Sequence, residues 1–139
     1  MATVTRAVPR ARVGLRAEVA SQAVTVAGVF CLTVGGAIHF DLGDFLLHRA
    51  PNYLVALFFL NAAGTLAAVA GIALRIRGAW TLGALIAVPS IVLLLIAGTS
   101  GLPGVHLRSL TSASEVACLA AEALYTLLWV RLARRDLGF

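Results

Sequence analysis

Residues 79–99 have the sequence AWTLGALIAVPSIVLLLIAGT, a run without a single charged side chain. A helix that crosses a bilayer needs about 20 consecutive, mostly apolar residues. Three further runs, at about 19–40, 53–74 and 112–130, have the same character and contain no Lys or Arg. The backbone must satisfy its own hydrogen bonds in lipid, so we expect all four runs to be transmembrane helices.

The composition supports a membrane protein as well. Hydrophobic residues make up 60% of the 139-residue chain and charged residues 12%, and the mean hydropathy is +0.96. Soluble domains carry about 25% charged residues, so a soluble globular enzyme and a disordered chain are both excluded. We expect an all-α membrane protein: a single antiparallel four-helix domain at 19–132, with a basic tail at 1–18 and a short tail at 133–139.

The basic residues, all of them arginine, predict the orientation. Nine would lie on one side of the membrane and two on the other: Arg6, Arg10, Arg12, Arg16, Arg75, Arg77, Arg131, Arg134 and Arg135 against Arg49 and Arg108. The positive-inside rule therefore places both termini in the cytoplasm. A chain rich in Arg, Ala and Gly is typical of a GC-rich bacterial genome, which indicates a bacterial plasma membrane. The net charge of +5 is explained by contacts with lipid headgroups, and we expect no nucleic-acid partner.

The first outer link, residues 41–52, carries much of the unusual chemistry. If this segment is helical, Asp44 and His48 share one face at a spacing of four residues. Pro51 would then end the element. We therefore expect a short amphipathic helix that lies at the outer membrane surface.

The same segment offers ligands for a transition metal. His39, Asp44 and His48 could bind zinc, copper or iron, although no standard spacing is present. The alternative is a solvated helix in which Asp44 pairs with His48 or Arg49. Haem is the less favoured cofactor, because only His39 among the imidazoles lies near a span. The other candidates for a polar or ligand site at the outer face are Asp41, His106 and Glu115.

The fourth span carries a polar stripe. Its members, spaced three or four residues apart, are Glu115, Cys118, Glu122, Tyr125 and Trp129. Glu122 lies near mid-membrane, where a carboxylate costs at least about 2.5 kcal/mol on the insertion scale. We expect it to face the bundle in its neutral form, because burial disfavours the charge. Its predicted partners are Asn61, Thr65 or Ser90, and its role is either structural or functional.

Small residues predict where the helices pack closely. Gly64 with Ala68, and Gly83 with Ala87, are spaced four apart, which lets helix backbones approach each other. We interpret these pairs as contacts within one bundle; a dimer interface is the alternative. Pro89 lacks a backbone donor and is expected to bend the third span.

Two stretches carry a resemblance to other sequences: GGAIHFDLGDFLLHRAPNYLVALFFLNAAG at 35–64, and GTSGLPG at 98–104, which is followed by an acidic fourth span. In these features the chain resembles a group of small actinobacterial four-span integral membrane proteins, over roughly residues 30–125. The resemblance implies the four-span topology and no particular activity. Residues 105–108 depart from the acidic or glycine-rich continuation of that group. The matching positions are His39, His48, Gly101, Leu102, Pro103, Gly104 and Glu122.

The sequence contains no signature of an enzyme. A P-loop, GxSxG, HExxH, CxxC and a dinucleotide-binding glycine pattern are all absent. We favour a non-enzymatic membrane protein that binds a small ligand or a metal at its outer face. The alternatives are a structural or accessory subunit of a larger membrane complex or homodimer, and a small proton-coupled transporter that uses Glu122.

Overall fold

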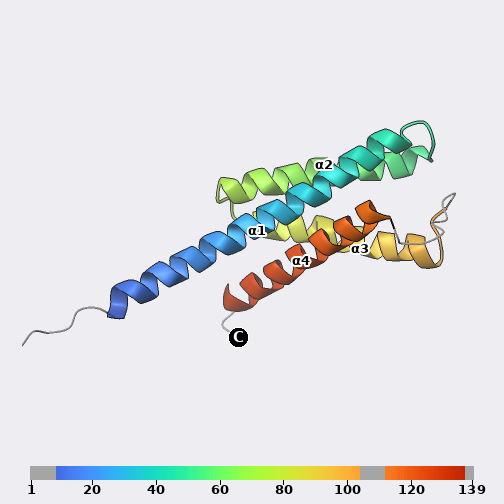
Figure 1. Cartoon of the computed structure of the whole chain (residues 1–139). Coiled ribbons are helices and arrows are strands. Elements are labelled where there is room, and N and C mark those ends of the chain that lie inside the picture. The colour runs from blue at the N-terminus through green and yellow to red at the C-terminus, as the bar shows by residue number, and fades with distance from the viewer. Residues whose placement is uncertain (1–8, 104–111, 137–139) are drawn as a thin grey trace, which may run out of the picture.

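The computed structural model describes residues 9–103 and 112–136, and this part of the chain folds into four long α-helices (Figure 1). They are α1 (Pro9–Leu46), α2 (Asn52–Ala73), α3 (Ala79–Thr99) and α4 (Ala113–Asp136). Each contains a stretch long and apolar enough to cross a membrane. The prediction of an all-α protein with four potential membrane spans is confirmed.

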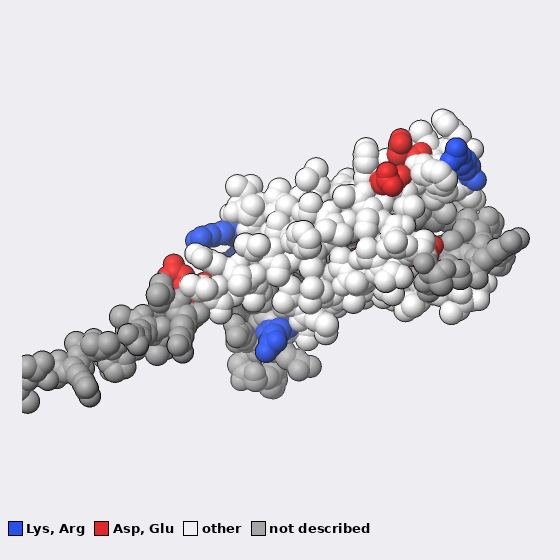
Figure 2. Space-filling view, in the orientation of Figure 1, with Lys and Arg blue, Asp and Glu red and all other residues white. Residues whose placement is uncertain are grey.

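The surface of the bundle is apolar in the middle and charged at the ends. Figure 2 shows the described basic and acidic side chains near the two ends of the molecule, with an uncharged band between them. Large side chains on every helix, such as Val26, Leu66, Leu85 and Leu127, are exposed over roughly two thirds of their area. Soluble monomers rarely expose apolar patches of more than a few hundred Å². The band therefore indicates a multi-pass membrane protein.

The helices form a ring in which each one contacts two neighbours: α1 packs against α2 and α4, and α3 packs against α2 and α4. The link between α2 and α3 is a tight turn. Arg75, at φ 57°, takes the left-handed position after α2, and the Ile76 amide donates to the Gly71 carbonyl oxygen at 2.8 Å. This is the Schellman pattern of a helix end. Gly78 also has a positive φ, 82°, which glycine adopts without steric cost.

Helix α1 is longer than the sequence predicted. A separate short helix was expected after Phe40, but α1 continues without a break to Leu46. Pro9 begins α1 and no other proline occurs before Pro51, and Gly43 is accommodated because it packs against Phe58 and Phe59 of α2. The 38 residues of α1 span about 57 Å, compared with about 30 Å for the hydrocarbon core of a bilayer.

Aromatic residues and glycines pack closely in the half of the bundle near the α2–α3 link. Tyr125 of α4 is fully buried, and its ring stacks on Trp80 of α3 with 5.4 Å between centroids. Its hydroxyl donates to the Trp80 carbonyl oxygen at 2.9 Å. A Cβ atom on Gly28 would overlap the Trp80 ring, and one on Gly83 would overlap Tyr125. Gly64 similarly faces Ile86. Gly64 and Gly83 therefore serve contacts within the chain, as predicted.

Candidate functional site

A buried cluster of polar side chains lies between α1, α3 and α4. It consists of His39 on α1, Ser90 on α3, and Cys118 and Glu122 on α4. The exposed fractions of His39, Cys118 and Glu122 are 7%, 5% and 5%. One potential ligand atom from each of these three lies within 4.8 Å of the other two. The three residues form the only such group of His, Cys, Asp and Glu side chains within residues 9–103 and 112–136.

The imidazole ring of His39 is held from both sides. Its Nδ1 lies 2.8 Å from the Gly35 carbonyl oxygen, and its Nε2 lies 3.0 Å from Ser90 Oγ. A carbonyl oxygen can only accept, so Nδ1 carries the hydrogen. In the neutral ring, Nε2 is then the acceptor and the Ser90 hydroxyl donates to it. The Phe58 ring, with its centroid 5.5 Å away, covers part of the imidazole.

Glu122 brings a carboxyl group into this apolar interior. Its Oε1 lies 3.8 Å from His39 Nε2, too far for a direct hydrogen bond. Its Oε2 is buried and has no hydrogen-bond partner among the described residues. The predicted burial of Glu122 inside the bundle is confirmed. Of its predicted partners, Thr65 instead donates to Asn61 Oδ1 at 3.2 Å.

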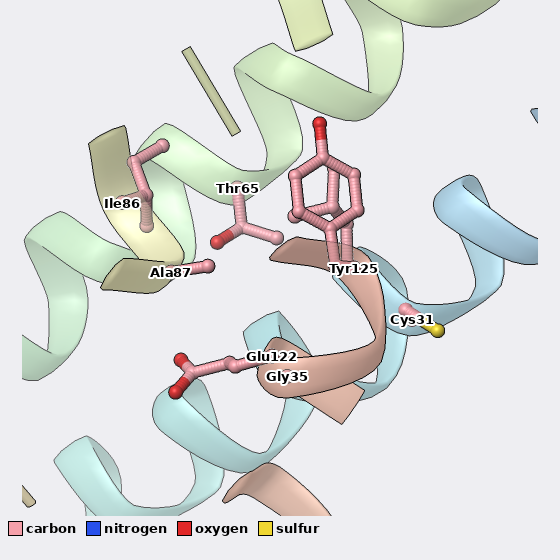
Figure 3. A pocket seen from close by; sticks show the side chains of 8 residues that line it. Cys31, Gly35, Thr65, Ile86, Ala87, Glu122 and Tyr125 are labelled. Carbon is pink, nitrogen blue, oxygen red and sulfur yellow. The ribbon is translucent and has the colours of Figure 1, made fainter. Parts of the chain in front are cut away.

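A cavity of about 10 Å³ lies beside Glu122 and is bordered by Gly35 and Thr65 (Figure 3). This volume corresponds to about one water molecule. Cys31 also borders the cavity, but Figure 3 shows its sulfur pointing away from the Glu122 carboxyl group. The two buried cysteines are therefore not equivalent: Cys118 Sγ lies 3.6 Å from His39 Nδ1, whereas Cys31 points elsewhere.

A much larger cleft, of about 650 Å³, opens in the other half of the bundle, toward the α1–α2 link. All four helices contribute to it. Leucine and phenylalanine side chains form much of its wall, for example Leu57, Phe58, Leu93 and Leu94. Among residues 9–103 and 112–136, its polar lining consists of the cluster members His39, Ser90 and Cys118, together with Arg49, Asn61, Ser112, Ser114 and Glu115.

The other predicted site residues have different positions. The side chains of Asp41, Asp44 and His48 are exposed and are not part of the buried cluster. The structure thus separates His39 from the two residues predicted to bind a metal with it. The physical reason is the packing of α1, which turns His39 toward α3 and α4 while Asp44 and His48 stay exposed. His106 lies outside the described residues.

Glu115 has a local structural role at the start of α4. Its Oε2 accepts a hydrogen bond from the Ser112 amide at 3.1 Å, and the Ser112 hydroxyl accepts one from the Glu115 amide at 3.2 Å. This reciprocal pair is a capping box, which satisfies two free amides of the first helical turn. The Ser-x-x-Glu spacing is visible in the sequence and could have revealed this role.

Sequence reasoning also missed the proximity of His39 to Cys118. The two residues are 79 positions apart, and a cysteine within a span is most simply interpreted as a small apolar side chain. The available signal was the spacing of Cys118 and Glu122, which places both on the same face of α4.

No protein-family model matches the chain, and no curated protein or solved structure is significantly similar to it.

Proposed function

We propose that this protein is a non-enzymatic membrane protein that binds a small amphipathic molecule in the cleft between its helices. The observation that carries the proposal is an apolar cleft of about 650 Å³ that reaches the buried side chains of His39 and Cys118. Ligand sites typically have volumes of about 300–1,000 Å³, apolar walls and a few polar groups.

The lining indicates what the ligand looks like. An apolar body would contact the leucine and phenylalanine side chains, while one small polar group would approach Ser90 and Asn61. A hydroxyl suits this place, because it both donates to and accepts from such groups. Much of the cleft wall is apolar and lies within the spans, so we infer that the ligand partitions into the bilayer before it binds.

The arginine distribution supports an orientation for this site. With both termini in the cytoplasm of a bacterial plasma membrane, the cleft opens in the outer half of the bilayer. The last turns of α1, residues 41–46, then lie at the outer interface. We also propose that the chain is related to the small actinobacterial four-span membrane proteins that 35–64 and 98–104 resemble; this resemblance implies the four-span topology and no orientation.

A second candidate function is that of an accessory subunit in a larger membrane complex. It is favoured by one observation: both ring nitrogens of His39 already have neighbours within the bundle, Gly35 O and Ser90 Oγ. A purely structural histidine needs no further ligand. In this case the polar cluster would fix the packing of α1 against α3 and α4.

Photolabelling distinguishes the two functions. The probe is an aryl diazirine with a benzylic hydroxyl, which matches the apolar body and single polar group inferred above. Under the binding proposal it labels peptides that line the cleft, and Ala97→Trp reduces this labelling because Ala97 is buried and lines the cleft. The milder Ala97→Leu should reduce it less. Leu95→Trp is the matched control, since Leu95 is exposed on the same helix.

The result can contradict the proposal in either of two ways. Equal labelling of wild type, Ala97→Trp and Leu95→Trp would show that the probe samples the lipid-facing surface only. Labelling confined to peptides outside the cleft would likewise show that the probe does not bind in the cleft. Thermal unfolding of each variant, measured in the same detergent, shows that the bundle remains folded during the comparison.

A further inference from the structure

We infer that His39, Cys118 and Glu122 form a binding site for a divalent transition metal of the zinc class. The three side chains supply an imidazole, a thiol and a carboxyl group, and one ligand atom of each lies within 4.8 Å of the others. Glu122 Oε2 is buried and lacks a hydrogen-bond partner in the described part of the chain. These residues share only His39 with the trio of His39, Asp44 and His48 that the sequence offered as possible metal ligands.

The spacing of the ligands is close to that of a tetrahedral zinc site. Metal–ligand bonds of about 2.0–2.3 Å place neighbouring ligand atoms about 3.3–3.8 Å apart. The three ligand atoms lie within 4.8 Å of one another, so a bound metal would draw them together by about 1 Å. Glu122 Oε1 lies 3.8 Å from His39 Nε2, whereas Cys118 Sγ lies 3.6 Å from the other ring nitrogen, Nδ1. Cys118 therefore has to turn toward Nε2 when the metal binds.

The surroundings of His39 prepare Nε2 as that ligand atom. Metal-binding histidines almost always donate their other ring N–H to a carbonyl or carboxylate, which fixes the tautomer and the ring orientation. The hydrogen bond from Nδ1 to the Gly35 carbonyl oxygen, at 2.8 Å, has this form. Ser90 Oγ, 3.0 Å from Nε2, would release the nitrogen when the metal binds.

The charges of these groups favour a divalent ion in this apolar place. An unpaired carboxylate buried in a membrane protein is unfavourable. When a divalent cation binds, the Cys118 thiol and the neutral Glu122 carboxyl group each lose a proton, because the thiolate and the carboxylate are the metal ligands. Both protons leave through the cleft, which Cys118 lines. Two positive charges then balance one thiolate and one carboxylate, the imidazole stays neutral, and the site as a whole carries no net charge.

The metal site shares His39 and Cys118 with the cleft, so this inference rests on the proposed binding function of that region. Three protein ligands leave one coordination position of zinc open. A donor atom of the molecule in the cleft could complete the coordination. The inference therefore narrows the ligand class to small amphipathic molecules with an oxygen, nitrogen or sulfur donor.

The experiment uses the full chain, purified in detergent, treated with a chelator and then loaded with zinc alone. We expect about one equivalent of zinc in wild type. Loading with cobalt(II) instead should produce a thiolate-to-cobalt charge-transfer absorption in the near ultraviolet. Cys118→Ser, Glu122→Gln and His39→Gln should each weaken zinc binding beyond the about 10–100-fold that loss of a second-shell partner causes.

The controls separate this site from the alternatives. Cys31→Ser removes the other buried cysteine, whose sulfur points away from the cluster, and should leave the cobalt spectrum unchanged. Asp44→Asn and His48→Gln remove the exposed residues of the α1–α2 region and should leave zinc uptake unchanged. Zinc should also raise the melting temperature of wild type but not of Cys118→Ser.

Several results would overturn the inference. Wild type that holds less than about a tenth of an equivalent after loading has no such site. Cobalt that binds without a thiolate band would exclude Cys118 as a metal ligand. Zinc that is lost in Asp44→Asn or His48→Gln but retained in the cluster variants would place the metal at the surface. If a cluster variant fails to fold, the cobalt spectrum of wild type against Cys31→Ser still decides the question. Zinc uptake is measured without the photolabel, so its failure leaves the cleft experiment intact.

Discussion

Two buried glycines provide a matched test of how the helices pack. A Cβ atom on Gly83 would overlap the hydroxyl and ring of Tyr125, while one on Gly35 would meet only Glu122 Cγ, at 3.7 Å. Tyr125 cannot easily give way, because it is fully buried and stacked on Trp80. Gly83→Ala should therefore destabilise the bundle, whereas Gly35→Ala should not.

The magnitudes follow from the contacts. Overpacking a well-filled core costs about 1–3 kcal/mol, and loss of the hydrogen bond from Tyr125 to Trp80 adds about 0.6 kcal/mol in a membrane protein. Alanine favours a helix over glycine by about 0.5–1 kcal/mol. The net loss for Gly83→Ala is then about 0.5–3 kcal/mol, and Gly35→Ala gains about 0.5–1 kcal/mol.

The assay is the free energy of unfolding of each variant in one detergent, measured by denaturant titration with circular dichroism. Tyr125→Leu serves as a second background, because it removes the ring that the new methyl group would overlap. There, Gly83→Ala should cost much less than in wild type. Equal stability of Gly83→Ala and Gly35→Ala in the wild-type background would refute this account of the packing.

Three more predictions concern the cluster, the topology and the start of α4. Glu122→Gln should keep the stability of wild type, whereas Glu122→Leu should lose up to about 1.7 kcal/mol in the same unfolding titration, because only the glutamine keeps a polar group facing His39. Loss of a ligand-linked function in the Gln variant alone would show that the Glu122 proton is needed, and equal behaviour of all three proteins would show that Glu122 is not held in the bundle. A cysteine placed at Arg49 should react with a membrane-impermeant thiol reagent from outside intact cells, and one at Arg77 only after the membrane is opened; labelling of position 77 from outside would reverse the orientation. Ser112→Ala should reduce the free energy of unfolding by about 0.5–2 kcal/mol, because it removes the hydroxyl that accepts from the Glu115 amide in the capping box. An unchanged unfolding curve would mean that this cap is not formed.

The sequence predicted the four helices well, because membrane spans are specified by the length and polarity of single segments. Residues 79–99 contain no charge, and α3 has the same bounds. The end of α1 was harder to predict. Polar side chains at Asp41 and Asp44 resemble a surface link, but a helix leaving the membrane accommodates them without a break.

The candidate site was predicted only in part, because it depends on contacts between distant segments. The depth of Glu122 in its span indicated a buried carboxyl group, and the structure confirms this burial. Nothing local to His39 shows that its ring faces Cys118 and Ser90 rather than Asp44. That choice depends on how α1 rotates and packs against α3 and α4, which periodicity alone does not specify.

The distribution of the cluster along the chain has a consequence for biosynthesis. His39 belongs to the hairpin of α1 and α2, whereas Ser90, Cys118 and Glu122 belong to the hairpin of α3 and α4. As the chain leaves the ribosome, the first hairpin enters the bilayer with the Nε2 atom of His39 still without its neighbour. Only after α4 has been inserted can the polar groups meet, so an incomplete chain exposes a polar helix face to lipid, which a membrane protease could recognise. The same side chains that hold the folded site together would then mark a chain whose synthesis stopped early.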